Sequence, residues 1–357
     1  MVNLDDLVRI KQVDSKNMAG SIIYLKEQVK SAWEEVKSLE LPSDYKEVDN
    51  VVLVGMGGSA LGAHIIRSVY DLSVSFQIVG DYFLPSFVDE KTLVIASSYS
   101  GTTEEVISAL QDARSKKTKI VGIGSGGTLA EELKKHDLPY LQFDTKYNPS
   151  GNPRLGLGFS IAGTLGVLVK LGLMNVTDSN ISEIGNTIDE ANKLFGLESN
   201  TNGNEAKQTA LALKDKIFTI IAGPFLAGNA HAFANQINES AKVFGGYFLL
   251  SEINHHLLEG LSHPEGLKNT IKFFNLESDL YADKIKLRLE IENELLEKNG
   301  IEFTSYKVKA ARMDLAAFET LVFSSWTSLY MAISYGVDPS IIAKVESFKE
   351  ELKKRAG

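Results

Sequence analysis

Short apolar runs alternate with amphipathic stretches along the first half of the chain. Runs that resemble β-strands begin near Val51, Phe76, Thr92, Ile120 and Tyr140, and helical stretches separate them. Continuous apolar runs of this length are typical of buried strands, because both faces of a parallel sheet are covered by helices. The alternation therefore predicts an α/β fold with a parallel sheet.

A dense turn signal divides the chain. The segment Asn148–Pro153 combines proline, glycine, serine and asparagine, which favour a loop. We therefore predict two domains, residues 1–150 with leading helices and residues 151–357 with a closing helix, each a mainly parallel sheet flanked by helices. Further strands are predicted near residues 217–224, 247–250, 268–275 and 303–308, and helices near residues 159–173, 181–197, 205–213, 310–335 and 339–355.

Two of the predicted turns between strand and helix favour the binding of a phosphate group. Val54–Ser59 reads Val-Gly-Met-Gly-Gly-Ser, and Ser97–Thr103 reads Ser-Ser-Tyr-Ser-Gly-Thr-Thr. Glycines let backbone N–H groups approach an anion, and the helix N-terminus adds a favourable dipole. Neither turn has the Gly-Lys-Ser/Thr of a P-loop or the Rossmann glycine spacing. Each turn alone could be an ordinary connection, but the pair favours a small phosphosugar ligand.

Composition and charge narrow the classes of function. The chain has 357 residues, 44% of them hydrophobic, and a net charge of −9 at pH 7. The acidic balance argues against nucleic acid as a partner, because no basic excess is present to neutralise phosphates. No apolar run reaches the about 20 residues needed to span a bilayer, so no membrane partner is expected. The chain has no cysteine, which excludes disulfides and thiolate catalysis. We expect a cytoplasmic protein.

Candidate acid–base residues lie in the second half. Glu239 stands in Asn-Glu-Ser-Ala-Lys, and His255 follows sixteen positions later in Glu-Ile-Asn-His. A carboxylate and an imidazole presented to one sugar are what an aldose–ketose isomerisation needs, because one moves the proton between C1 and C2 and the other opens the ring. Arg154, in the turn between the predicted domains, is a candidate to stabilise the enediolate.

Each of these residues also has a simpler interpretation. Glu239 alone could be a solvated helix residue, and Arg154 could form a surface ion pair. The pair His255 and His256, with Glu252 and Glu259 nearby, could bind a metal ion, although the spacing matches no known ligand motif.

At these positions the chain resembles the archaeal-type bifunctional phosphoglucose/phosphomannose isomerases, which are built from two sugar isomerase (SIS) domains. The resemblance covers nearly the whole chain. The Ser-x-Ser-Gly-Thr-Thr element is shared by many SIS proteins and marks phosphosugar binding only. The glutamate and histidine elements, in their order and spacing, are more specific. The resemblance rests on Gly55–Ser59, Ser98–Thr103, Pro153–Gly156, Asn238–Lys242 and Glu252–His255.

The resemblance implies a binding site for the sugar 6-phosphate. Hydroxyl groups of the two turns would hold the phosphate, and backbone amides would line the site. The residues that match the family at these positions are Ser59, Ser98, Ser100 and Thr103 for the hydroxyls, and Gly57 and Gly58 for the amides.

The resemblance also implies the chemistry. Glu239 would take the C2 proton, Arg154 would stabilise a cis-enediol intermediate, and Lys349 near the C-terminus would belong to the site. His255 would open the sugar ring and would come from the neighbouring subunit of a homodimer. Glucose 6-phosphate and mannose 6-phosphate would be interconverted with fructose 6-phosphate without a metal or cofactor, a reaction of glycolysis and gluconeogenesis.

The chain departs from the family pattern in two places. The family usually reads Asn-His-Asn-Glu, whereas this chain has His256 and Leu257 after His255. A threonine that the family links to mannose tolerance is matched only by Ser340. Two alternatives stay open: a non-catalytic phosphosugar sensor with SIS domains, and an isomerase of another phosphosugar.

Overall fold

The first sheet is formed by strands that begin where the apolar runs begin. The computed structural model describes residues 3–356, and within this range the first sheet has five parallel strands in the order β2-β1-β3-β4-β5. Every residue of the central strand β3 is buried, as expected for a parallel strand covered on both faces. The strands are β1 (Asn50–Val54), β2 (Ser75–Val79), β3 (Thr92–Ser98), β4 (Lys119–Gly124) and β5 (Tyr140–Gln142).

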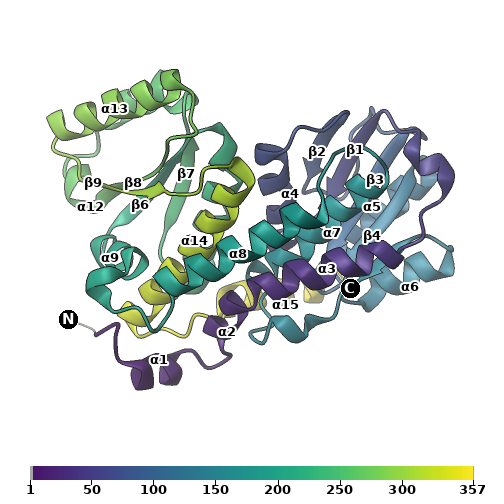
Figure 1. The fold of residues 1–357 in the computed structure, drawn as a ribbon, viewed down its shortest axis with the longest axis horizontal. Coiled ribbons are helices and arrows are strands. Elements are labelled where there is room, and N and C mark those ends of the chain that lie inside the picture. The colour runs from purple at the N-terminus through teal and green to yellow at the C-terminus, as the bar shows by residue number, and fades with distance from the viewer. Residues whose placement is uncertain (1–2, 357) are drawn as a thin grey trace.

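The second sheet is also parallel. In the described residues it has four strands in the order β7-β6-β8-β9. The fold class predicted from the sequence, an α/β chain with two parallel sheets flanked by helices, is confirmed (Figure 1). The strands are β6 (Ile217–Ala222), β7 (Gly245–Leu249), β8 (Ile271–Ser278) and β9 (Phe303–Val308).

The strand expected from Lys268 begins later than predicted. Residues Leu267–Thr270 form the short helix α12, and β8 begins at Ile271. Gly266 before this helix has a φ of 84°, a left-handed backbone conformation that glycine adopts readily. The sequence therefore predicted the strand but not the short helix that precedes it.

Helices cover both sheets and connect them. Those of the first half are α1 (Leu7–Val13), α2 (Met18–Ile23), α3 (Leu25–Ser38), α4 (Gly58–Val69), α5 (Glu104–Ser115), α6 (Gly127–Lys135) and α7 (Leu157–Lys170). Those of the second half are α8 (Asp178–Phe195), α9 (Glu205–Ala212), α10 (Ala227–Gln236), α11 (Leu257–Gly260), α13 (Asp283–Lys298), α14 (Met313–Tyr335) and α15 (Ala343–Ala356). Short single-turn segments are η1 (Ser43–Lys46), η2 (Thr145–Tyr147), η3 (Pro153–Leu155), η4 (Thr201–Gly203), η5 (Pro224–Leu226), η6 (Ile237–Ala241) and η7 (Glu252–His255).

The two halves share a core. One apolar cluster contains residues of both sheets, and α7 packs against α3 and α4 beside the first sheet. The division at residues 150 and 151 stays a prediction.

Helix α4 from the first half packs against α10 from the second. A Cβ on Gly228 would lie 2.4 Å from the backbone of His64, so this contact requires a residue without a side chain. Because α4 follows the glycine-rich turn and α10 leads to Glu239, this packing brings the turn and Glu239 to the same side of the molecule.

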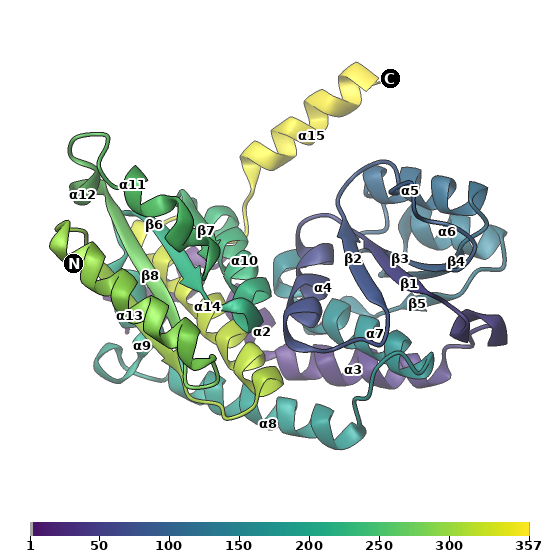
Figure 2. The ribbon, with the colours of Figure 1, turned by 90° about the horizontal axis from the view of Figure 1, so that it is seen from above.

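The last helix lies apart from the rest of the fold. Figure 2 shows α15 extending away from both sheets. Apolar side chains remain exposed along one stripe that leads into and along it, with exposed fractions from 38% to 67%. The stripe consists of Ile341, Val345, Phe348 and Leu352. Among residues 3–356, none of the helices combines the length and apolar character that a bilayer span requires.

Candidate active site

Arg154 lies in η3, which packs against the first glycine-rich turn at the N-terminus of α4. Strand β1 ends at Val54 and α4 begins at Gly58, after Gly57 with a φ of 49°. A Cβ on Gly58 would lie 2.6 Å from the carbonyl carbon of Pro153 and 2.7 Å from the nitrogen of Arg154. Only glycine permits this approach of two backbones. The glycine-rich turn and η3 therefore form one unit.

Hydrogen bonds join the two predicted phosphate turns. The Tyr99 N–H donates to Ser59 Oγ over 2.8 Å, and Ser97 Oγ donates to the Ser59 carbonyl over 3.0 Å. Ser59 is buried. Because the carboxyl ends of β1 and β3 lie side by side, the two turns occupy the same edge of the sheet, where ligands of open α/β sheets bind.

The hydroxyl groups of the second turn have different surroundings. Ser98 is fully buried, and its Oγ accepts from the Gly101 N–H at 3.0 Å and shares a hydrogen bond with Thr103 Oγ1 at 2.9 Å. Ser100 is exposed, and its Oγ shares a hydrogen bond with Thr102 Oγ1 at 3.0 Å. The Ser98 hydroxyl therefore shapes the loop, whereas the Ser100 hydroxyl is open to a ligand.

Arg154 is the most completely enclosed charged group of the site. Its residue is 1% exposed. Nε donates to Ser240 Oγ at 2.8 Å, and Nη1 donates to Glu239 Oε2 at 3.0 Å and to Asn152 Oδ1 at 3.2 Å. Nη2 donates to the Pro339 carbonyl at 2.7 Å. Burial lowers the pKa of the guanidinium and Glu239 opposes this, but an arginine stays protonated in proteins.

Glu239 occupies a widened turn of helix. Helix α10 ends at Gln236 and continues as the π-helical turn η6, a form that is frequent at functional sites. The Glu239 side chain is 27% exposed, so one side of the carboxylate faces Arg154 and the other is open. A partly exposed carboxylate with a buried cationic partner can act as a base on a bound ligand.

Lys242 fastens this turn to the loop after α14. The residue has a φ of 58°, and its Nζ donates to the carbonyls of Glu239 at 2.9 Å, Ser240 at 3.0 Å and Asp338 at 2.8 Å. Partial burial and the nearby Arg154 guanidinium lower the pKa of this lysine to about 8, while Asp338 and Glu239 oppose the shift. The same loop receives Arg154 through Pro339, so Lys242 and Arg154 together fix the position of Glu239.

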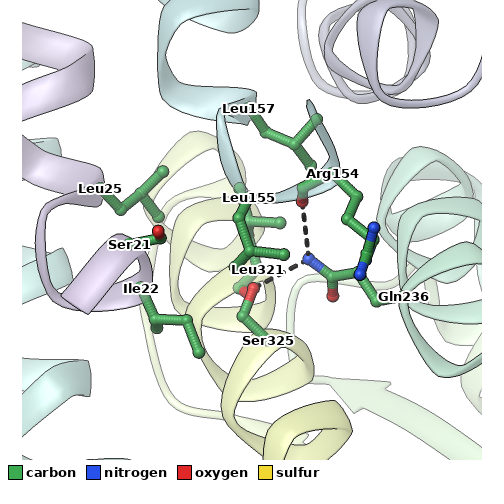
Figure 3. A pocket seen from close by; sticks show the side chains of 9 residues that line it. All are labelled: Ser21, Ile22, Leu25, Arg154, Leu155, Leu157, Gln236, Leu321 and Ser325. Atoms are coloured by element: carbon green, nitrogen blue, oxygen red, sulfur yellow. Dashed lines mark hydrogen bonds between the residues drawn. The ribbon is translucent and has the colours of Figure 1, made fainter. Parts of the chain in front are cut away.

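A small pocket lies behind Arg154. In Figure 3 the Gln236 amide points at the backbone of Arg154 and at Ser325. Its Nε2 donates to the Arg154 carbonyl at 3.3 Å and to Ser325 Oγ at 2.9 Å. The pocket thus belongs to the support of Arg154, and its lining is Ser21, Ile22, Leu25, Arg154, Leu155, Leu157, Gln236, Leu321 and Ser325.

Two of the sequence-predicted residues form no hydrogen bond or ion pair with Glu239 or Arg154 among the residues that the structure describes. His255 ends the turn η7 and is exposed, and the structure gives it no hydrogen bond to Glu239 or Arg154. Lys349 is exposed on α15, which extends away from the site (Figure 2). The residues that the structure describes contain no group of three or more His, Cys, Asp or Glu arranged to hold a metal ion.

Four further residues of the candidate site were not predicted from the sequence. Ser240 and Lys242 stand in the same short motif as Glu239, and this proximity was their only signal. Asn152 lies in the predicted turn between the domains. Pro339 contributes a backbone carbonyl from 185 positions away, for which the sequence has no signal.

Comparison with known proteins identifies the family to which the chain is related. The family model of the bacterial phospho-glucose isomerase C-terminal SIS domain matches residues 202–352. The bifunctional phosphoglucose/phosphomannose isomerase of Caldicellulosiruptor bescii is 34% identical over 346 residues, covering 94% of this chain and 98% of that protein. The protein of the same name from Thermoplasma volcanium is 30% identical over 307 residues, covering 85% of this chain and 91% of that protein.

Solved structures agree on the fold. The structure of a hypothetical protein from Thermus thermophilus matches with a TM-score of 0.75 at 16% identity, covering 98% of this chain and 94% of that chain. At an identity this low, the match shows a shared fold and nothing about function. The sequence matches, which extend over nearly the whole length of both proteins, show the relationship itself: the chain belongs to the family of bifunctional phosphoglucose/phosphomannose isomerases.

Proposed function

We propose that this protein is an aldose–ketose isomerase that interconverts glucose 6-phosphate and mannose 6-phosphate with fructose 6-phosphate. The observation that carries the proposal is the half-open Glu239 carboxylate, held 3.0 Å from the buried Arg154 guanidinium. This ion pair adjoins the glycine-rich turn at Gly58. A base, a fixed positive charge and an anion-binding turn therefore lie together, in a chain whose relatives bear the name of this activity.

The 6-phosphate would bind at the two turns. The exposed hydroxyls around Ser100 would donate hydrogen bonds, and the backbone amides of Gly57 and Gly58 at the start of α4 would contribute a favourable dipole. Ser59, Ser98 and Thr103 would shape these turns through the contacts described above and would lie within reach of the phosphate.

Proton transfer would then proceed through a cis-enediol. Glu239 takes the proton from C2, the electrons of that C–H bond form the C1–C2 double bond, and the former carbonyl oxygen at C1 carries the negative charge. The C1 oxygen then takes up the proton that the neighbouring C2 hydroxyl releases, so the two oxygens exchange one proton and none is gained or lost overall. Glu239 returns its proton to C1 as the C2 hydroxyl becomes the carbonyl. Arg154 stabilises the charge on the enediolate oxygens. The mechanism assigns no step to a metal or cofactor, because these two side chains supply the base and the positive charge.

The same site can serve both aldoses. Glucose 6-phosphate and mannose 6-phosphate differ only at C2, and C2 is planar in the enediol. Rotation about the C2–C3 bond lets one base deliver the proton to either face. Ser340, in the loop that receives Arg154 and Lys242, is 2% exposed, and we assign to this loop the tolerance of the mannose configuration.

The site would be completed by a second subunit of a cytoplasmic homodimer. His255, the ring-opening group, is exposed and lies apart from Glu239 in the chain. The apolar stripe of α15 is also exposed, and a patch of this kind is typical of an interface. We therefore assign His255, and Lys349 on α15, to a site shared between subunits. The reaction would serve glycolysis and gluconeogenesis.

Turnover on the two aldoses tests the proposal directly. Purified protein in EDTA is expected to form fructose 6-phosphate from both glucose 6-phosphate and mannose 6-phosphate. Activity on glucose 6-phosphate alone would retain the mechanism and restrict the specificity. A folded protein without activity on either sugar would contradict the proposal and favour a phosphosugar sensor or an isomerase of another phosphosugar.

Mixing two inactive variants tests the shared site. Glu239→Gln dimers and His255→Ala dimers are each expected to have little activity. In a hybrid dimer, the Glu239 of the His255→Ala chain meets the His255 of the other chain, so one of its two sites is complete. Random exchange of subunits should therefore restore about a quarter of the native activity. If both residues served the same chain's site, mixing would restore nothing.

A further inference from the structure

The two residues that precede His255 in the turn η7, Ile253 and Asn254, are packed or hydrogen-bonded against neighbouring elements. Ile253 is fully buried in an apolar cluster with Phe273 of β8 and Leu289 of α13. Asn254 is half-buried, and His255 itself is exposed. A short turn of this kind has few contacts of its own, so these anchors decide where the imidazole points.

Asn254 is held from both ends by one helix. Its Nδ2 donates to Glu292 Oε2 over 2.6 Å, and its Oδ1 accepts from Arg288 Nη1 at 3.2 Å. Arg288 and Glu292 are four positions apart on α13, so they lie on one face of the helix. The amide can satisfy both partners in only one orientation, because its donor and acceptor atoms differ.

Burial of the Glu292 carboxyl at this position costs free energy. It is 1% exposed, and its Oε1 is buried with no hydrogen-bond partner among the described residues. Burial raises the pKa of this carboxyl, which the hydrogen bond from Asn254 opposes. An apolar side chain of similar volume would avoid the cost of burying a polar group. The hydrogen bond to Asn254 is the contact that distinguishes the carboxyl from such a side chain.

We propose that Glu292 is a positioning residue for His255, acting through Asn254. The inference rests on the ring-opening role assigned to His255 in the proposed function. Glu292 does not touch the sugar. It fixes the turn η7 against α13, so that the imidazole is presented in one direction to the ligand.

The test compares ring opening with proton transfer in three variants. Glu292→Met removes the acceptor of the Asn254 hydrogen bond and keeps the length of the side chain. Its kcat on glucose 6-phosphate is expected to fall between about 10-fold and 100-fold, with KM little changed, as for a misplaced catalytic group. Glu292→Gln keeps an oxygen acceptor and should recover most of this loss. Glu290→Met, at an exposed position of the same helix, is the matched control and should behave as the native protein.

A second readout separates positioning from a purely structural role. Exchange between the α- and β-anomers of fructose 6-phosphate, followed by NMR, reports ring opening without transfer of the C2 proton. In Glu292→Met this exchange should slow by the same factor as kcat, while the melting temperature stays close to that of Glu292→Gln. If Glu292→Met does not fold, Asn254→Ala removes the same hydrogen bond from the turn and should slow the exchange equally.

The outcomes distinguish this inference from the function on which it rests. A native protein that isomerises neither aldose overturns both. An active native protein whose Glu292→Met or Asn254→Ala variant exchanges anomers at the native rate overturns the positioning role alone. Equal losses in Glu292→Met and Glu292→Gln would also overturn it, because the hydrogen bond would then not be the cause.

Discussion

Replacing Glu239 with glutamine is expected to lower turnover on glucose 6-phosphate by a factor of about 10²–10⁴ without unfolding the protein, the range for a removed general base. Glutamine has the same shape and its amide oxygen can still accept the hydrogen bond that Arg154 donates to Glu239 Oε2. Its amide cannot hold the C2 proton. The loss should therefore appear in kcat, with the affinity for the phosphosugar retained.

Steady-state kinetics with both aldoses measures the loss in kcat, and a thermal melt shows whether the variant is folded. The matched control is Glu40→Gln, an exposed carboxylate outside the site, which should leave the rate unchanged. Exchange of the C2 proton with deuterated water should fall in parallel with kcat. A Glu239→Gln variant with near-native turnover would remove Glu239 from the mechanism.

Arg154→Met is expected to damage both stability and activity. The substitution leaves Glu239, Ser240 and the Pro339 carbonyl without the donor that now joins them. Removal of one partner of a buried ion pair costs about 3–5 kcal/mol, and we expect the lower end because the Glu239 side chain remains 27% exposed to water. Turnover should fall by about 10²–10³, the loss that follows removal of a group stabilising an oxyanion.

Urea unfolding at pH 7 measures the loss in stability, and kinetics at a temperature where the variant is folded measures the loss in activity. Arg154→Lys is the control, because lysine keeps the charge but cannot reach every acceptor from one ammonium group. It should be intermediate in both measurements. An Arg154→Met variant within about 0.5 kcal/mol of the native stability, the range of an ordinary surface substitution, would show that the observed contacts contribute little.

The pattern of apolar runs was sufficient to predict the architecture. The predicted strands correspond to β1 through β9 within a few residues. For the central strands, such as β3, the reason is that a strand buried on both faces must be apolar along its whole length. The glycine and hydroxyl turns were located for a similar reason: their residue types follow from local backbone geometry. Gly57, for example, has a φ of 49° at the start of α4, a backbone conformation that glycine adopts readily.

The organisation of the site is a different matter. Glu239 and Arg154 were recognised as candidates, but their ion pair spans 85 positions, and the contact of Arg154 with Pro339 spans 185. The π-helical turn at Glu239 has no periodic pattern in the sequence that predicts it. The same holds for the hydrogen bonds that Lys242 donates to the carbonyls of Glu239 and Asp338. The roles of His255 and Lys349 stay predictions, since both side chains are exposed and neither forms a hydrogen bond with Glu239 among the described residues.

Residue pattern and local backbone chemistry thus specified which segments become strands, helices and the turns for which we propose phosphate binding, because each of these elements depends largely on neighbours within a few positions. The packing of α4 on α10 and the return of the chain after α14 decided which of the polar groups meet. Such contacts arise from the geometry of whole elements, and the residues that form them, among them Pro339 with its backbone carbonyl, need have no distinctive side chain.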